Sequence, residues 1–239
     1  MKLEQRLYSP YWPIEHNRFM PIQWRSEDFS EEAKKVIEII KQEARSPDEP
    51  IFIRGSIIES LHPDPRSDID IVVIRSQLIS QSFPRSFADS FRRPLDINIY
   101  SQDALEPKTY LLPLIHICSY QASGPFFERK PVEIDRHFIF ELWNQYAVYS
   151  LPQQIVPQDR FRISYLKQLL RVQGLLSLLA GDGFTRHIPS CLTWLSAQNP
   201  QLGHLAQQIW DWRSSDQILF IEPIVHWTVE RFEWLVEQS

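Results

Sequence analysis

The chain has 239 residues, of which 43% are hydrophobic, and 25 basic against 30 acidic residues give a formal net charge of −5. This length and apolar content are sufficient to bury a substantial core. The acidic balance argues against a protein that coats duplex nucleic acid, because such proteins carry an excess of basic residues.

The first predicted helix begins after Ser30. Ser30 can cap a helix, and Glu31 and Glu32 suit the positive end of the helix dipole. An apolar face at helical spacing follows, made of Ala33, Val36, Ile37, Ile40 and Ala44. We expect the helix to end at Ser46-Pro47-Asp48, since a proline cannot continue it.

Three short strands are predicted after this helix. They are Ile51–Arg54, Asp68–Ile74 and Leu95–Tyr100, the last of which (LDINIY) alternates strictly between apolar and polar residues. Gly55–Ser67 is predicted to be a turn and loop between the first two strands. Phenylalanines at positions i, i+4 and i+8 predict a short helix between the second and third strands; they are Phe83, Phe87 and Phe91.

The chain changes character near residue 130. Leu111–Ala122 is apolar and predicted to be helical, and beyond Pro131 all predicted elements are helices. They cover 133–150, a long stretch after Pro157, and about 187–198, 201–213 and 223–237. We therefore expect two domains, residues 1–130 with strands and helices, and residues 131–239 with helices alone.

Three aspartates stand inside the predicted strands. Side chains alternate along a strand, so Asp68 and Asp70 lie on one face, opposite Ile69 and Ile71. Asp96 lies on the polar face of its own strand. If the two strands are neighbours, about 4.8 Å apart, the three carboxylates meet on one surface.

Clustered carboxylates repel one another and are costly to desolvate unless a cation neutralises them. The cation can be a basic side chain, or Mg²⁺ or Mn²⁺, which bind a few carboxylates together with substrate phosphate. Gly55-Ser56 follows directly on a strand and suits the phosphate, because glycine lets backbone N–H groups approach closely and serine adds a hydroxyl. The combination is typical of a nucleoside triphosphate site.

The order of these motifs resembles one known pattern. An apolar segment, Gly55-Ser56, eleven residues, Asp68-Ile69-Asp70 and a later Asp96 are similar to the DNA polymerase beta–type nucleotidyltransferase superfamily, over roughly residues 30–130. The resemblance implies an α+β fold, with a mixed sheet that carries helices on one side, and a C-terminal all-helical domain. It also implies that the helical domain binds the acceptor, as in antibiotic nucleotidyltransferases.

The resemblance implies specific roles for these residues. Asp68 and Asp70 would hold the metal, and Asp96 would complete the metal site and help to deprotonate the acceptor. Gly55 and Ser56 would contact the triphosphate. The expected reaction is metal-dependent transfer of a nucleoside monophosphate to a hydroxyl of a small molecule, with release of pyrophosphate. The alternatives are a catalytically lapsed nucleotide-binding or interaction module, and a nucleotidyltransferase acting on RNA or protein.

Other charged residues allow two interpretations. Arg54 and Arg66 can neutralise phosphate charge or form surface ion pairs. Glu141 can act as an acceptor-side base, as a helical-domain carboxylate does in the antibiotic-modifying relatives, or lie on a solvated helix face. The loop His62-Pro63-Asp64-Pro65-Arg66 departs from the Gly- or Ala-rich segment of many small members of the superfamily.

The second domain offers weaker signals. Arg160, Lys167 and Arg171 are predicted to share a helix face, which would suit an RNA acceptor or simply face solvent. A set of aromatic residues can stack a base or sugar, or belong to the core; they are Trp143, Tyr146, Tyr149 and Tyr165.

The sequence also indicates a compartment. The two cysteines, Cys118 and Cys191, form neither a disulfide framework nor a zinc-binding pattern. The N-terminal sequence lacks a basic segment followed by an apolar one, and no apolar run approaches membrane-spanning length. We expect a soluble cytoplasmic protein with no membrane partner.

Overall fold

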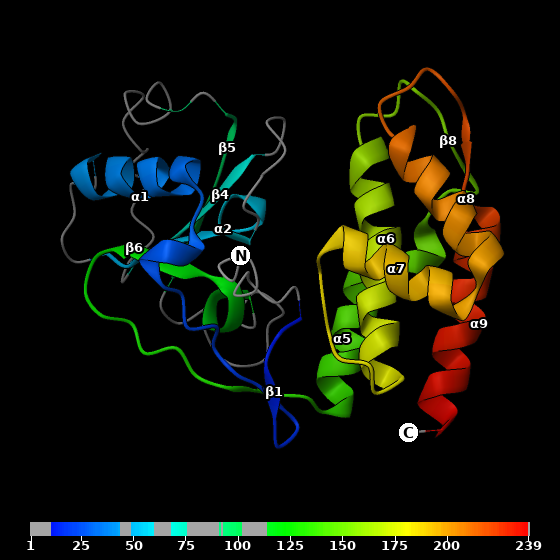
Figure 1. Ribbon diagram of the computed structural model, residues 1–239, viewed down its shortest axis with the longest axis horizontal. Coiled ribbons are helices and arrows are strands. Elements are labelled where there is room, and N and C mark those ends of the chain that lie inside the picture. The colour runs from blue at the N-terminus through cyan, green and yellow to red at the C-terminus, as the bar shows by residue number, and fades with distance from the viewer. Residues whose placement is uncertain are drawn as a thin grey trace, which may run out of the picture. The chain divides into compact units, whose positions relative to one another are not determined.

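The computed structural model describes residues 11–43, 49–59, 68–75, 91, 93–101 and 114–238 (Figure 1). The chain divides into two compact units, Pro13–Glu133 and Ile134–Ser239, and Tyr11 and Trp12 belong to the second. The predicted helix at Phe83 and Phe87, the loop 62–66 and the helix end at 46–48 lie outside the described residues.

The first unit is built on a four-stranded sheet in the order β5–β4–β3–β6. Its strands are β3 (Ile51–Arg54), β4 (Ile69–Arg75), β5 (Leu95–Ser101) and β6 (Tyr120–Ser123). β4 runs parallel to β5, and β3 runs antiparallel to both β4 and β6, so the sheet is mixed, as predicted. The three predicted strands are confirmed to within one residue at each end, and the second and third are neighbours.

Alternation along these strands separates two sets of side chains. One face is lined by isoleucine, valine and leucine: Ile51, Ile53, Ile69, Ile71, Val73, Leu95, Ile97 and Ile99. The opposite face carries Phe52, Val72 and Ile74, which are covered by Ile115 and Phe127. Each strand therefore contributes to the core on both faces, and the apolar residues predicted to point inward do so.

Helix α1 (Glu31–Glu43) covers the first of these faces (Figure 1). Ser30 caps it, since its hydroxyl accepts from the Ala33 N–H at 3.1 Å and its carbonyl accepts from the Lys34 N–H at 3.0 Å. The buried residues of its apolar face are Ala33, Val36, Ile37 and Ile40. Ile57 and Ile58 of the short helix α2 (Ser56–Glu59) join the same cluster.

The helix predicted over Leu111–Ala122 is wrong in part. A π-helical turn, η3, covers Leu114–Cys118, and the chain then enters strand β6. The carbonyl of Ser119 accepts hydrogen bonds from Trp24 Nε1 at 3.0 Å and from Arg129 Nη1 at 2.9 Å. Because tertiary donors occupy this carbonyl, it is not available to continue a helix, and the next residues pair with β3 instead.

The remaining elements of this unit are short. They are β1 (Ile14–Glu15), β2 (Arg18–Phe19), β7 (Val132–Glu133) and the 3₁₀ turn η1 (Ser26–Asp28). β2 pairs antiparallel with both β1 and β7 in a small sheet of its own.

The second unit is helical, as predicted, apart from one short antiparallel strand pair, β8–β9. Its elements are α5 (Arg136–Tyr146), η4 (Val148–Ser150), β8 (Gln154–Ile155), α6 (Arg162–Leu179), α7 (Ile188–Gln198), α8 (Pro200–Asp211), β9 (Leu219–Phe220) and α9 (Glu222–Gln238). Asp135 caps α5 by accepting from the Phe138 N–H at 2.7 Å. Asn199 caps α8 in the same way, accepting from the Leu202 N–H at 3.1 Å.

The predicted helix face of Arg160, Lys167 and Arg171 is not formed. Arg160 does not share a helix face with Lys167 and Arg171, because α6 begins only at Arg162. The Asp159 carboxylate accepts from the Phe161 N–H at 2.8 Å and forms a turn that delays the helix.

Trp143 and Tyr146 are core residues, since each is 3% exposed. The ring of Trp143 stacks on Phe232 with centroids 3.8 Å apart. Tyr149 is largely exposed and donates to Glu233 Oε1 at 3.2 Å. Across the described part of the chain, the helices are either too short or too polar to cross a membrane.

Candidate active site

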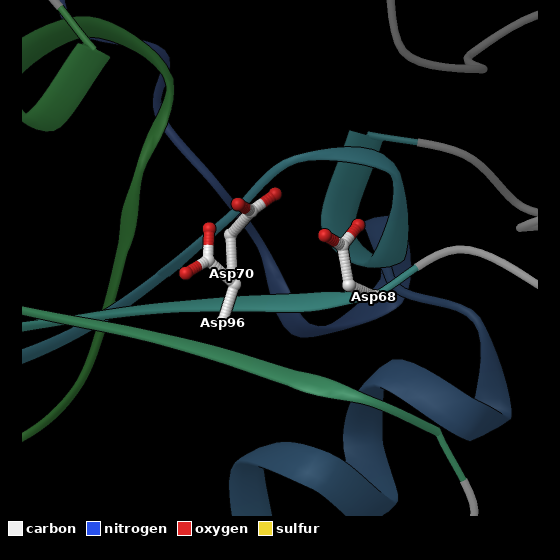
Figure 2. Close-up of side chains that lie close together, drawn as sticks. All are labelled: Asp68, Asp70 and Asp96. Carbon is white, nitrogen blue, oxygen red and sulfur yellow. The ribbon is translucent and has the colours of Figure 1, made fainter. Parts of the chain in front are cut away.

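The three aspartates come together, as predicted, at one end of the sheet. Asp70 on β4 and Asp96 on β5 are paired in register between parallel strands, and Asp68 immediately precedes β4. One carboxylate oxygen of each lies within 4.8 Å of one oxygen of the other two. Figure 2 shows the three carboxylates rising from the same side of the sheet. We call Asp68, Asp70 and Asp96 the carboxylate triad.

The triad is accessible from solvent. Asp68 and Asp96 are exposed, and the Asp70 side chain keeps 26% of its surface accessible. Ile69 and Ile71, which flank Asp70 on β4, point to the opposite face and are 1% and 0% exposed. The strand is therefore anchored by its apolar side chains, while its carboxylates remain open to a ligand.

Gly55 lies against the triad. Its φ is +79°, in the left-handed region, and a Cβ on this residue would overlap the carboxylate of Asp70. Its carbonyl accepts from the N–H groups of Ile58 at 3.1 Å and Glu59 at 3.0 Å, which starts α2 at Ser56. Glycine is thus required here twice, for the turn and for the close approach of Asp70. The sequence had predicted a turn here and close approach of the backbone to a phosphate, but not the contact with Asp70.

Arg54 belongs to the same site. It is the last residue of β3 and the register partner of Asp70, so the two side chains leave neighbouring strands on one face. Its Nη2 lies 3.8 Å from Asp70 Oδ1, and its side chain is 14% exposed. Arg54 therefore forms an ion pair, as one of the two interpretations expected, but a partly buried one with a residue of the triad. Arg66 lies outside the described residues.

Two further residues of β5 share this face but were not singled out from the sequence. Asn98 and Tyr100 follow Asp96 at intervals of two, so the alternation that places Asp96 also places them. Burial raises the pKa of the Tyr100 hydroxyl; Arg54 opposes the rise and Asp96 adds to it. Tyr100 therefore lies within the electrostatic reach of both charged groups.

The donor set fits a hard divalent cation. Mg²⁺ binds oxygen ligands at about 2.0–2.1 Å, so oxygens on opposite sides of one ion are about 4.2 Å apart. Neighbouring ligands of an octahedral ion lie closer, at about 3 Å, so the triad oxygens, all within 4.8 Å of one another, must converge further when they bind one ion. The residues that could hold the ion are Asp68, Asp70 and Asp96, and carboxylate oxygens are ligands that Mg²⁺ and Mn²⁺ prefer.

Glu141 lies in the second unit, on the exposed side of α5. It has no hydrogen bond or ion pair with any other described residue. This environment matches a solvated helix face and leaves the carboxylate available to a ligand.

Comparison with known proteins supports the fold. The structure resembles the crystal structure of spectinomycin adenyltransferase AAD(9) from Enterococcus faecialis with ATP and spectinomycin, with a TM-score of 0.58. The match covers 85% of this chain and 98% of that one, at 11% sequence identity. No protein-family model and no curated protein matches the sequence. The chain therefore has a nucleotidyltransferase-like fold, with the mixed sheet and C-terminal helices expected from the motif.

Proposed function

We propose that the protein is a metal-dependent nucleotidyltransferase that transfers a nucleoside monophosphate from a nucleoside triphosphate to a hydroxyl of a small molecule, releasing pyrophosphate. The observation that carries this proposal is the convergence of three carboxylates from β4 and β5 beside Gly55, on a nucleotidyltransferase-like fold. A strand that only needed to pack would not bring three like charges together at its open end.

The residues have distinct roles in this reaction. Asp68, Asp70 and Asp96 would hold Mg²⁺ or Mn²⁺, which when bound neutralises charge that develops on the phosphoryl and leaving oxygens. The Asp96 carboxylate accepts the proton of the acceptor hydroxyl. The backbone N–H of Gly55 and the hydroxyl of Ser56 bind phosphate oxygens of the substrate.

The bonding changes take place on the substrates. The acceptor oxygen attacks the α-phosphorus in line, a new O–P bond forms, and the bond from the α-phosphorus to the bridging oxygen of pyrophosphate breaks. The chain contributes mainly positioning and charge neutralisation, because phosphoryl transfer needs little covalent participation by the enzyme.

The choice of substrates follows the structural neighbour, which was crystallised with ATP and spectinomycin. We propose ATP as a donor and a small hydroxyl-bearing molecule as the acceptor, in a cytoplasmic enzyme. We propose that residues 131–239 form the acceptor-binding domain, with Glu141 as a candidate base.

The test is a transfer assay with labelled nucleoside triphosphates, Mg²⁺ and a whole-cell extract as the source of acceptors, read out as pyrophosphate release and as label in a new product. Asp70→Ala should abolish both signals while circular dichroism and the melting temperature show a folded protein. Glu38→Ala is the matched control, since it removes an exposed acid on α1, which covers the other face of the sheet.

The result also separates the alternatives. Calorimetric binding of Mg²⁺ and ATP without pyrophosphate release across a broad acceptor panel would indicate a lapsed nucleotide-binding module. Label that appears on RNA or protein would redirect the proposal to a macromolecular acceptor, and a steep loss of affinity with salt would accompany RNA. Undiminished turnover by Asp70→Ala would refute the assignment.

A further inference from the structure

Arg54 is a cation placed within an acidic site. It is held there by its strand, because it ends β3 directly before Gly55 and pairs in register with Asp70. At 14% exposure its side chain is mostly buried, although a basic residue at a strand end can usually reach solvent. The guanidinium therefore remains beside the triad.

The contact between Arg54 and Asp70 is loose. The Nη2–Oδ1 distance of 3.8 Å is an ion pair but exceeds hydrogen-bonding distance. The Nε of Arg54 is buried and has no hydrogen-bond partner among the described residues. Arginine normally meets a carboxylate through two short N–H···O bonds, so this pair is an electrostatic contact rather than a locked one.

The charge balance of the site explains such an arrangement. Three carboxylates whose oxygens lie within 4.8 Å repel one another in the metal-free protein. Arg54 supplies one positive charge against three negative ones. A divalent ion that binds the triad is repelled by the guanidinium, whereas a triphosphate that binds the same site is attracted by it.

We propose that Arg54 is a counter-ion of the triad in the metal-free protein, and that it disfavours binding of a divalent ion alone while favouring binding of the nucleoside triphosphate. The inference rests on the proposed function, because it concerns the same metal and nucleotide site. In this arrangement the negative charge of the empty site is partly offset, and the metal is retained well only together with its anionic substrate. Arg54 is thus a residue that couples metal binding to nucleotide binding.

The test uses Arg54→Met, which removes the charge and all donors but keeps an unbranched side chain. Binding of Mn²⁺ alone is measured by the electron paramagnetic resonance signal of the free ion, and binding of ATP by calorimetry at saturating Mg²⁺. We expect Mn²⁺ to bind about tenfold more tightly, since one repelling charge is lost. We expect ATP to bind about tenfold more weakly, since one attracting charge is lost from the phosphate site.

Thermal denaturation provides a second readout. In the absence of metal, Arg54→Met should melt at a lower temperature than the wild type, because the triad has lost its counter-ion. Saturating Mn²⁺ should narrow that difference, since the ion then replaces the missing charge. Arg54→Gln provides the same comparison with a polar side chain if Arg54→Met does not fold.

Two control variants identify the cause. Arg54→Lys keeps the charge and should bind Mn²⁺ within about threefold of the wild type. Arg18→Met removes an exposed positive charge from β2, in the separate small sheet, and should change neither affinity.

The inference predicts opposite effects of Arg54→Met on the two ligands, with tighter Mn²⁺ binding and weaker ATP binding. Weaker or unchanged Mn²⁺ binding by both Arg54→Met and Arg54→Gln would overturn the inference, because a merely structural arginine would weaken both ligands together. The proposed function has its own criterion: a wild-type protein that binds neither Mn²⁺ nor ATP would refute it, and would remove the basis of the inference as well. If the wild type binds both ligands and the Arg54 variants do not show the expected changes, only the inference about Arg54 is refuted.

Discussion

On the face of the sheet that packs against α1, strands β3, β4 and β5 present a continuous cluster of isoleucine, valine and leucine. On the other face, the same strands change from Phe52, Val72 and Ile74 to the charged side chains of Arg54, Asp70 and Asp96. Neighbouring residues such as Asp70 and Ile71 thus serve different purposes. One face supplies stability, and the end of the other carries the residues that we propose to be catalytic.

This division follows from strand geometry. Because side chains alternate strictly, a strand can bury an uninterrupted apolar face and still carry charges two residues apart on the other. A slip of one residue in register would exchange the two sets, which would bury the aspartates. The apolar face therefore also fixes where the carboxylates lie. The experiments below separate the two faces.

The largest expected effect is on the charged face. Asp96→Asn should reduce nucleotidyl transfer by about a thousandfold, because the loss of one preorganised charged group at the reacting phosphate costs about this much. Its melting temperature without metal should be unchanged or higher, since one of three repelling anions is removed. Pyrophosphate release and calorimetry measure the two quantities. Full activity would show that the third carboxylate has no part in the reaction.

A substitution on the neighbouring apolar face should instead lower stability and leave metal affinity unchanged. Ile71→Ala removes three carbons from a side chain that is 0% exposed. Such a truncation lowers the free energy of unfolding by about 2–5 kcal/mol. Chemical denaturation measures the loss, and the folded fraction should keep the metal affinity of the wild type. A loss below about 1 kcal/mol would mean that the core collapses around the gap.

Gly55→Ala should lower both metal affinity and stability, and these effects should be smaller than the main effect of either preceding variant. The positive φ strains an alanine by about 1–3 kcal/mol, and the new Cβ displaces the carboxylate of Asp70. We expect weaker Mn²⁺ binding, measured by calorimetry, together with a moderate loss of stability.

Gly181→Ala is the control for strain alone. Gly181 has φ +84° after α6, and a Cβ there would meet no atom within 4 Å. It should lose a similar amount of stability, about 1–2 kcal/mol, with normal metal affinity. Equal metal affinities in the two variants would show that Asp70 does not depend on the missing Cβ.

The smallest expected effect lies on the apolar side, where Glu32 of α1 accepts from Arg93 Nε at 2.5 Å and Nη2 at 2.6 Å. This hydrogen bonding lowers the pKa of Glu32 in the folded protein below its ordinary value of 4.5. The pair therefore stabilises the fold above the unfolded pKa and ceases to do so as the pH falls through the folded one. Glu32→Gln should cost about 1 kcal/mol near pH 7.

The difference between wild type and Glu32→Gln should shrink as the pH falls below 4.5 and disappear once the pH lies below the lowered folded-state pKa of Glu32, since Glu32 is then protonated in both states. Melting curves across this pH range measure it. Glu31→Gln is the control, because Glu31 pairs only with the exposed Lys34 one turn along the helix. A difference for Glu32→Gln that stays constant with pH would show that packing, rather than charge, holds the pair.

Most of the site was predictable because it depends on short-range periodicity. The alternation in LDINIY and in Asp68–Ile74 placed the three carboxylates on one face, and Gly55-Ser56 marked the end of β3. The same alternation would have indicated Asn98 and Tyr100, which were not singled out. The helix predicted over Leu111–Ala122 was wrong in part. The Ser119 carbonyl accepts hydrogen bonds from Trp24 and Arg129, two residues outside the predicted helix, and the pattern within the segment does not reveal such contacts.

The sequence by itself determined helix α1, the strands β3, β4 and β5, and which residues share a strand face, since all of these depend on local patterns of apolar side chains and caps. Only the tertiary structure decided that β4 lies next to β5 in the register that pairs Asp70 with Asp96. Only the tertiary structure brought Gly55 and Arg54 against Asp70. The physical reason is that strand neighbours and register are chosen by burying the whole apolar face at once, which no single segment of the chain specifies.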